Sequence, residues 1–397
     1  MRAMDSVWRY SPPWWLRGAH AQTIWSARLA CHWQDQSAPL RTYLGRASAS
    51  TEGGVIAGWR VPPVPADLMG TIPHWERERW QTPDSDFIDV DHLVMPPLPK
   101  DTGKKAPLVV LFHGLEGSRH SHYVHAMAHA CQTRGWQLML PHFRGCSGEI
   151  NLAPRAYHSG DFEEIDWILR RAANLHPGVP VVAVGVSLGG NALLRWAGEL
   201  GEAAGRVVRS VAAICPPLDL VASGQAIGRG INRVLYTRMF LASMKPKARA
   251  KWVQYPELFN LDAAMDAKTI LEFDNAFTAP VHGFKHVLDY WSRASAKPHL
   301  KNVAIPALVI NSKNDPFIPF ESIPIQAEVA DAITLWQPAG GGHVGFTQAG
   351  ITSRPPGHIS GLPRAVLDWL AANMSLSVAP TQPLLTTPTQ QASVANG

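Results

Sequence analysis

The chain has 397 residues, of which 46% are hydrophobic and 17% charged, a balance typical of a folded globule with a large core. The formal net charge is only +5, and Lys and Arg do not cluster as a nucleic-acid-binding protein requires. Composition therefore favours a folded chain over a disordered one and argues against a nucleic-acid partner.

The small positive excess is concentrated near the N-terminus. Residues 1–60 hold seven Arg, no Lys and three acidic residues, together with six of the 15 Trp. The preferred interpretation is an N-terminal arm that packs around the core. The alternative, which stays open, is a peripheral membrane contact, because Arg and Trp both combine an apolar body with a polar tip.

The cysteines are far apart and form no C-x-x-C pair, so neither a metal site nor a disulfide framework is expected. No apolar segment follows the charged start, which argues against a signal peptide, and no apolar run is long enough to span a membrane. A cytoplasmic location is therefore expected. The four cysteines are Cys31, Cys131, Cys146 and Cys215.

In chain order, the first hundred residues read as irregular and rich in Pro, with one predicted strand pair at 76–80 and 87–92. From residue 106, apolar runs typical of buried strands alternate with helical patterns, which predicts an α/β fold with a mostly parallel central sheet and helices on both faces. These predicted strands are residues 107–112, 137–141, 179–186, 207–215, 307–311 and 333–336, and the predicted helices are residues 123–133, 161–174 and 189–200.

The alternation stops after residue 215 and resumes after residue 300. The helix-prone segment 216–300 is too long for an ordinary connection and predicts an inserted helical cap. The expected organisation is an N-terminal arm with the first strands (1–105), a first core segment (106–215), the cap, and a second core segment (301–374). The charge-free tail, residues 375–397, is expected to be disordered.

The most informative motif is G-x-S-x-G at residues 185–189, directly after a predicted buried strand and before a predicted helix. Gly185 and Gly189 allow a sharp strand-to-helix turn that holds the Ser187 hydroxyl above the sheet. The N-terminus of the helix favours negative charge that develops there. The motif alone is common by chance, but in this setting it predicts Ser187 as a catalytic nucleophile.

A nucleophilic serine needs a base that a third group holds in place. In this arrangement the acid and then the histidine follow the serine, on loops after later strands. Asp315 follows the strand 307–311, and His343 follows the strand 333–336 within G-G-G-H-V-G. We therefore expect Ser187, Asp315 and His343 to form a catalytic triad.

Three other residues are alternative candidates for roles in this triad. Asp219 follows the strand 207–215 and could replace Asp315 as the acid. No strand leads into His358, and no elbow carries Cys146, so both are weaker candidates than His343 and Ser187.

The tetrahedral intermediate also needs an oxyanion hole, whose donors are expected to be two backbone N–H groups. One should belong to Leu188, which follows the nucleophile, and the other to Leu115, in the H-G-L-E-G-S loop after the strand 107–112. The alternative is that this loop is only a turn that ends a strand.

Taken together, these motifs resemble the YheT-like α/β hydrolases, a family that includes the ABHD esterases and lipases of animals. The resemblance covers residues 10–372; a Pro-rich stretch at 61–74 and the charge-free tail depart from it. It implies an α/β-hydrolase fold with a helical cap, the triad Ser187, Asp315 and His343, and hydrolysis of acyl esters. The matching segments are residues 13–23 (PWWLRGAHAQT), 113–118, 121–123, 144–149 (RGCSGE), 157–161 (YHSGD), 185–191 (GVSLGGN), 273–275 (FDN), 278–280 (TAP) and 314–317 (NDPF).

The expected function is a serine carboxylic-ester hydrolase that acts through an acyl-enzyme on short- to medium-chain or lipid-like acyl esters, with no metal or organic cofactor. Apolar cap residues such as Phe273 and Phe277 are expected to line an acyl pocket, although they could instead form the core of the cap. Acyl transfer, thioester hydrolysis and amide hydrolysis stay open, while an intact triad argues against a non-catalytic binding protein.

Overall fold

The computed structural model describes residues 8–30, 55–56, 59–60, 73–95, 105–349 and 355–374. Cys31, most of the Pro-rich stretch and the predicted disordered tail lie outside these ranges. In the described part, no helix is both long and apolar enough to cross a membrane.

An eight-stranded sheet with the order β10-β9-β8-β7-β5-β6-β4-β3 forms the centre of the molecule. The strands from β5 to β10 pair in parallel, while β3 and β4 form an antiparallel hairpin whose β4 pairs with β6. This confirms the predicted mostly parallel α/β sheet and the predicted strand pair. The strands are β3 (Trp75–Gln81), β4 (Phe87–Leu93), β5 (Leu108–Phe112), β6 (Gln137–Pro141), β7 (Val181–Val186), β8 (Val211–Ile214), β9 (Ala307–Ile310) and β10 (Ile333–Trp336). A separate pair, β1 (Val55–Ile56) and β2 (Trp59–Arg60), is antiparallel.

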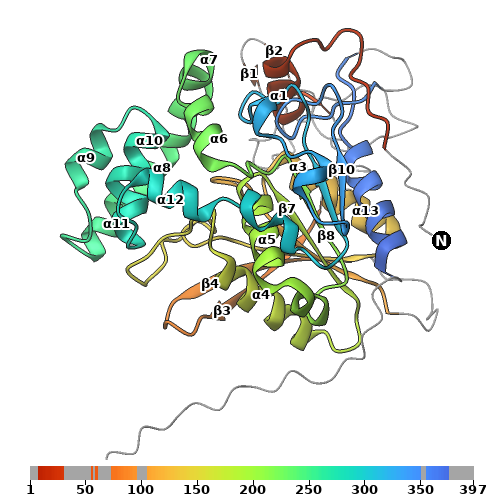
Figure 1. The fold of residues 1–397 in the computed structure, drawn as a ribbon, viewed down its shortest axis with the longest axis horizontal. Coiled ribbons are helices and arrows are strands. Elements are labelled where there is room, and N and C mark those ends of the chain that lie inside the picture. The colour runs from red at the N-terminus through yellow and green to blue at the C-terminus, as the bar shows by residue number, and fades with distance from the viewer. Residues whose placement is uncertain are drawn as a thin grey trace, which may run out of the picture.

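Helices cover both faces of the sheet, as the continuous apolar strands require (Figure 1). Alternate residues of β5 illustrate this, because Val109 and Leu111 belong to one hydrophobic cluster and Val110 belongs to the other. The first cluster includes residues of α3 (His122–Arg134) and α13 (Gly361–Met374), and the second includes residues of α4 (Phe162–Leu175) and α5 (Leu188–Leu200).

Between β8 and β9 the chain forms a cap of short helices, which lies to one side of the sheet (left in Figure 1). Hydrogen bonds fix both of its ends. The Asn191 Nδ2 on α5 donates to Ala294 O at 2.9 Å, and its Oδ1 accepts from the N–H of Ala296 at 2.9 Å. The N–H of Leu220 donates to Ser295 Oγ at 2.9 Å. The cap consists of α6 (Leu220–Ile227), α7 (Gly230–Asn232), η2 (Arg233–Thr237), α8 (Arg238–Gln254), α9 (Leu261–Asp266), α10 (Ile270–Phe273), η3 (Asp274–Thr278), α11 (Ala279–Val281) and α12 (Val287–Ala294).

Two expectations about the elements were wrong. The first hundred residues contain a helix, α1 (Ala19–Arg28), which packs against α3 and has little amphipathic pattern of its own. The strand predicted at 207–215 is limited to β8, because the 3₁₀ turn η1 (Gly201–Arg206) ends in hydrogen bonds from the N–H groups of Val207 and Val208 to Ala204 O. α13 was not predicted.

Much of the described N-terminal arm is packed. The ring of Trp8 lies 5.5 Å from that of Phe346, and the Tyr10 hydroxyl donates to Thr347 O at 3.0 Å. Trp14, by contrast, is 72% exposed. The described arm therefore fits the packed-arm interpretation, with Trp14 and the 40% exposed Ile24 as exceptions.

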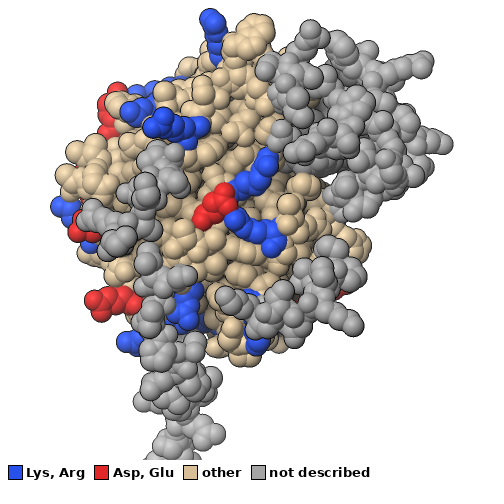
Figure 2. Space-filling model, turned by 90° about the vertical axis from the view of Figure 1, so that its right-hand side faces the viewer, with Lys and Arg blue, Asp and Glu red and all other residues tan. Residues whose placement is uncertain are grey.

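Charged side chains of both signs are scattered over the side of the molecule where α13 lies (Figure 2). Most of the described surface visible in that view is uncharged. The described residues visible on this side therefore form no broad basic patch of the kind that a nucleic-acid-binding surface needs.

Candidate active site

Ser187 occupies a strained turn between β7 and α5, with φ 52° and ψ −118°. A non-glycine residue rarely adopts a positive φ, and such strain concentrates at functional sites. The two motif glycines are required by close packing. A Cβ on Gly185 would lie 2.5 Å from Gly189 O, and a Cβ on Gly189 would lie 2.6 Å from His113 O. The turn therefore has the geometry expected of a nucleophile elbow.

The structure brings the three predicted triad residues together. His343 Nε2 lies 2.9 Å from Ser187 Oγ, and His343 Nδ1 lies 2.8 Å from Asp315 Oδ2. The other carboxylate oxygen, Asp315 Oδ1, accepts from the N–H of Phe317 at 2.8 Å. Asp315 follows β9 and His343 follows β10, so both residues lie at the carboxyl ends of neighbouring parallel strands, and His343 connects Asp315 to Ser187.

The weaker candidates have other contacts. The Asp219 carboxylate caps α6 and accepts from the N–H of Ala222 at 3.0 Å. His358 Nδ1 lies 2.9 Å from Ser360 Oγ. Burial raises the pKa of the Cys146 thiol to about 11, so this cysteine is not a thiolate at neutral pH.

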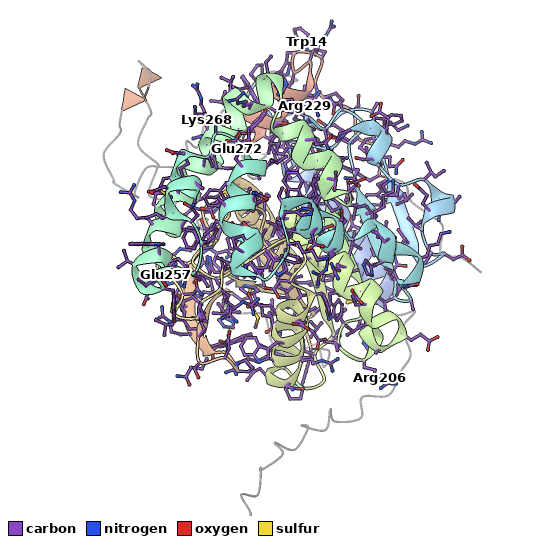
Figure 3. All side chains as sticks on the ribbon, turned by 60° about the vertical axis from the view of Figure 1, so that its left-hand side comes forward. Trp14, Arg206, Arg229, Glu257, Lys268 and Glu272 are labelled. Carbon is purple, nitrogen blue, oxygen red and sulfur yellow. The ribbon has the colours of Figure 1, made fainter. Side chains whose placement is uncertain are left out.

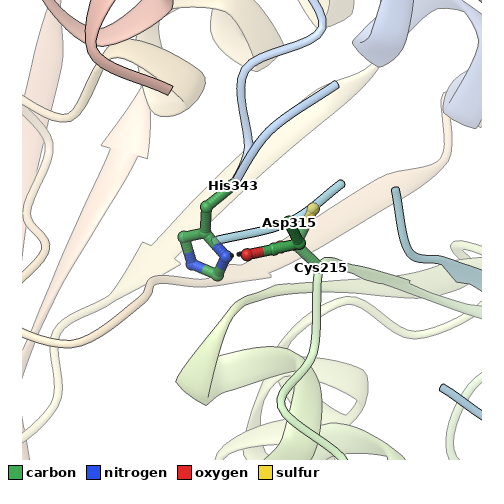
Figure 4. A group of neighbouring side chains, drawn as sticks. All are labelled: Cys215, Asp315 and His343. Carbon is green, nitrogen blue, oxygen red and sulfur yellow. Dashed lines mark hydrogen bonds and ion pairs between the residues drawn. The ribbon is translucent and has the colours of Figure 1, made fainter. Parts of the chain in front are cut away.

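Cys215, Asp315 and His343 bring potential metal-ligand atoms within 4.8 Å of one another (Figure 4). Two features disfavour a metal ion there. Burial raises the pKa of the Cys215 thiol well above its usual value, whereas a metal ligand must be a thiolate. His343 Nδ1 also already faces Asp315 Oδ2, so a metal at this nitrogen would displace the interaction that orients the imidazole.

Helix α1 supports the loops that carry the acid and the histidine. The Gln22 side-chain Oε1 accepts from the N–H of Gly341 at 2.7 Å and from Asn314 Nδ2 at 3.0 Å. Thr23 Oγ1 accepts from the N–H of His343 at 2.9 Å. Sequence reasoning missed the role of these residues, although both lie in the N-terminal segment that carried the family resemblance.

The predicted oxyanion loop lies directly against the nucleophile. A Cβ on Gly114 would lie 3.2 Å from the Ser187 Cβ. The N–H of Gly114 donates to the Tyr123 hydroxyl at 2.9 Å, which fixes the start of the loop. Leu188 is the first residue of α5, and the first N–H groups of a helix have no partner within it. Both predicted donor residues, Leu115 and Leu188, line the cavity above Ser187.

An ion pair joins this loop to the cap. Lys247 Nζ on α8 lies 2.8 Å from Glu116 Oε1, in the residue after Leu115. The Tyr157 hydroxyl donates to the same Glu116 oxygen at 2.7 Å and accepts from the N–H of Glu116 at 3.1 Å. Glu116 itself has φ 56°. Cap position and loop conformation are therefore directly linked.

A cavity of about 680 Å³ opens above Ser187 and His343 and extends beneath the cap. Both Phe273 and Phe277 line it, and the Phe277 ring also packs 4.7 Å from that of Phe259. These aromatics thus belong both to the cavity wall and to the core of the cap.

The cavity wall also contains a buried carboxyl group, that of Asp274. It accepts hydrogen bonds from Thr278 Oγ1 at 2.7 Å and from Trp291 Nε1 at 2.9 Å, and burial raises its pKa to about 6. The wall is therefore mainly apolar, but the cap contributes titratable groups to it, including the Asp274 carboxyl and the Lys247 and Lys251 ammonium groups.

The sheet, the nucleophile elbow and the cap together define the class of this protein. Residues 107–349 match the family model of the α/β-hydrolase fold. The chain is therefore a hydrolase. YheT of Escherichia coli K12, a candidate esterase, is 38% identical over 276 residues, or 69% of this chain and 78% of that protein. The chain belongs to the YheT-like family of α/β hydrolases.

Two further relatives carry names that specify a reaction. Phospholipase ABHD3 of Mus musculus is 31% identical over 61% of this chain and 59% of that protein. The medium-chain fatty acid ethyl ester synthase/esterase 2 of Saccharomyces cerevisiae is 28% identical over 53% of this chain and 52% of that protein. The matched segment thus spans less than two thirds of these two relatives.

Proposed function

We propose that the protein is a serine carboxylic-ester hydrolase that cleaves short- to medium-chain or lipid-like acyl esters. The observation that carries this proposal is the continuous chain of contacts from Ser187 Oγ through His343 to Asp315, at the floor of a largely apolar cavity. Membership of an esterase- and lipase-like family supports it.

In the first half-reaction, His343 Nε2 accepts the hydroxyl proton of Ser187 while Oγ attacks the ester carbonyl carbon. The Asp315 carboxylate accepts a hydrogen bond from Nδ1–H and stabilises the imidazolium that forms. The N–H groups of Leu115 and Leu188 donate to the oxyanion, a contribution of about 10²–10³-fold in rate for each donor. The C–O bond then breaks, and the leaving alcohol takes the proton from Nε2.

In the second half-reaction, water loses a proton to His343 Nε2 and attacks the acyl-enzyme carbonyl. Collapse of the second tetrahedral intermediate releases the carboxylic acid and returns the proton to Ser187 Oγ. These residues supply the nucleophile, the base and the oxyanion donors themselves, so no step needs a metal or an organic cofactor.

The apolar wall favours an acyl chain over a charged group as its occupant. Phe273 and Phe277 contribute aromatic surface beneath the cap, and each methylene that they bury is worth about 0.8 kcal/mol. We therefore assign the space beneath the cap to the acyl chain.

Acyl transfer to an alcohol is the second candidate function. The name of the yeast relative, which includes both synthase and esterase, favours it. The first half-reaction is the same, and an alcohol replaces water as the nucleophile in the second. Product analysis with ethanol added to the assay separates the two, because transfer yields an ethyl ester whereas hydrolysis yields only the acid.

The direct test is covalent labelling of Ser187. A fluorophosphonate probe should modify the wild-type protein at this serine, and Ser187→Ala should abolish labelling and lower kcat by about 10⁴–10⁶-fold while the protein stays folded. Peptide mapping by mass spectrometry locates the label. Labelling that persists in the Ser187→Ala variant would assign the nucleophile to another residue.

A further inference from the structure

Large apolar side chains are exposed around the mouth of the cavity. Of the 13 that are exposed in the described part of the chain, six lie on the N-terminal arm or between α7 and the start of α8. Three of these, Ile24, Leu235 and Met239, line the cavity itself. We call this set the mouth surface: Trp14, Ile24, Ile231, Val234, Leu235 and Met239, with exposed fractions from 40% to 72%.

The elements that carry the two parts of the mouth surface are in contact: α1, which carries Ile24, touches η2, which carries Val234 and Leu235. His20 Nδ1 on α1 lies 3.2 Å from the Tyr236 hydroxyl on η2, and the two rings are stacked. Trp14 and Arg229 project from the same end of the molecule, while Arg206 projects from the opposite end (Figure 3). The mouth surface is therefore one feature of the fold, although its residues lie about 200 positions apart in sequence.

Positive charge surrounds these apolar side chains. Residues 220–256 contain seven Lys and Arg and no Asp or Glu, and residues 8–30 contain three Arg and no acid. Within the described ranges, the ion pairs of arginine with acidic side chains involve other arginines. The exposed arginines beside the mouth are Arg17, Arg28, Arg229, Arg233 and Arg238.

A groove beside the mouth is also lined by both basic and apolar side chains. Arg233, Arg238, Lys245 and Lys268 line this groove of about 650 Å³ together with Val234 and Leu241. The nearby acid Glu272 accepts from the backbone N–H of Lys268. The groove therefore offers several cationic groups to an anion near the rim of the cavity.

We infer that the mouth surface docks onto an anionic phospholipid bilayer, so that the cavity opens toward the membrane and receives its acyl ester from there. This deepens the proposed function and rests on it. Apolar side chains would enter the headgroup boundary, while the arginines would face lipid phosphates.

Charge complementarity favours an anionic bilayer over a second copy of the chain or a soluble protein as the partner of the mouth surface. A second copy of the chain would oppose the same unpaired arginines to one another, which is unfavourable. A soluble protein partner would need a matching acidic and apolar patch. An anionic bilayer supplies both the negative charge and the apolar interior, and it is also a source of lipid-like esters.

The test uses the full chain and sedimentation with vesicles of phosphatidylcholine alone or mixed equally with phosphatidylglycerol. The wild type should partition onto the mixed vesicles, weakly onto the neutral ones, and less tightly as salt rises. Arg229→Glu with Arg233→Glu should weaken partitioning by at least about 25-fold, because each basic group near such a surface contributes about fivefold. Ile231→Ser with Val234→Ser should also weaken it.

Matched controls are Arg206→Glu and Leu175→Ser, which change one exposed basic and one exposed apolar residue away from the mouth surface. These variants should partition like the wild type. Hydrolysis of a water-soluble short-chain ester should be unchanged in every variant, which shows that fold and site are intact.

Each failure has a distinct meaning. A wild type that cleaves the soluble ester but does not sediment with mixed vesicles would overturn the docking inference and leave the proposed function standing. Mouth-surface variants that sediment like the wild type would overturn it as well. The docking inference would also be overturned if the wild type bound no vesicles but formed dimers that these variants disrupt. The mouth surface would then be an interface between copies of the chain. A wild type inactive on all esters would remove the proposed function, whatever the vesicles show.

Discussion

Two aspartates compete for the role of the acid at the level of single residues. Asp315 Oδ2 reaches His343 Nδ1 at 2.8 Å, whereas the Asp219 carboxylate caps α6. Asp315→Asn should lower kcat by about 10⁴-fold, because the amide leaves the imidazole in the wrong tautomer. Asp219→Asn should leave kcat within about twofold and change stability little, because Asn caps a helix about as well as Asp. Steady-state kinetics of both variants on one ester distinguishes the two aspartates. A larger loss of kcat in Asp219→Asn than in Asp315→Asn would contradict the assignment of Asp315 as the acid.

Gln22 is a positioning residue for the loops that carry Asp315 and His343. Gln22→Leu removes the acceptor of the Gly341 N–H and of Asn314 Nδ2, so the loop that carries His343 should shift from its position. We expect kcat to fall about 10- to 100-fold with little change in KM, because small misplacements of a catalytic group are costly.

The matched control for this prediction is Ser26→Ala, one turn further along α1. Ser26 is equally buried and bonds to Gln22 O and to Thr347 Oγ1, four residues beyond His343, but not to Asn314, Gly341 or His343. It should lower the melting temperature without lowering kcat. Equal losses of kcat in both variants would mean that α1 acts only through overall stability.

The sequence predicted that Ser187, Asp315 and His343 would lie together, but it did not predict the residues that support their loops, for a physical reason. Ser187, Asp315 and His343 each follow a buried strand, and parallel strands bring their carboxyl ends to one edge, so local pattern and chain order suffice. The contact between Gln22 and Gly341 spans 319 positions and depends on how α1 docks on the finished core. No local periodicity encodes that docking.

At the level of elements, the cap should determine acyl-chain preference. Phe273→Ala or Phe277→Ala enlarges the cavity and should move the optimum of kcat/KM toward longer acyl chains, measured with a series of esters from acetate to laurate. Phe259→Ala is the control, because Phe259 packs against Phe277 within the cap but does not line the cavity. Identical relative rates in the wild type and both cavity variants would exclude the cap as the specificity element.

The elements themselves were predictable to different extents. Strands buried on both faces, such as β5 and β7, are short continuous apolar runs rich in Val, and length and residue type together make them recognisable in the sequence. Helix α1 has almost no amphipathic pattern and is defined by its contacts with α3 and the catalytic loops. The helical character of the cap was predictable, but its division into short helices with π-helical turns at η2 and η3 was not.

For the whole molecule, a buried neutral histidine predicts that the free energy of unfolding falls at acid pH. His113 Nδ1–H donates to Gly114 O at 2.8 Å, and Nε2 accepts from the N–H of Phe143 at 3.1 Å. Burial lowers the pKa of His113 to about 3, whereas the unfolded chain binds a proton near its ordinary pKa of 6.5. The unfolded state therefore holds more protons between these values. His113 contributes its stability above pH 6.5 and loses it as the pH falls toward 3.

Between about pH 8 and pH 5, this group alone should cost about 2 kcal/mol of unfolding free energy. Urea unfolding at both pH values measures the loss. His113→Gln keeps a donor for Gly114 O and an acceptor for the N–H of Phe143 but does not titrate, so its stability should change less with pH. An unaltered pH dependence in this variant would place the acid sensitivity elsewhere.

The hydrogen bonds that tie Leu220 to Ser295 and both Ala294 and Ala296 to Asn191 close the base of the cap into a ring. They fix the two points at which the chain leaves the core for the cap and returns from it, however many residues lie between those points. Such a fixed attachment makes the cap an exchangeable module. Descendants of one ancestral enzyme could lengthen, shorten or replace it, and so acquire new substrates, while the residues that perform the chemistry stay in register.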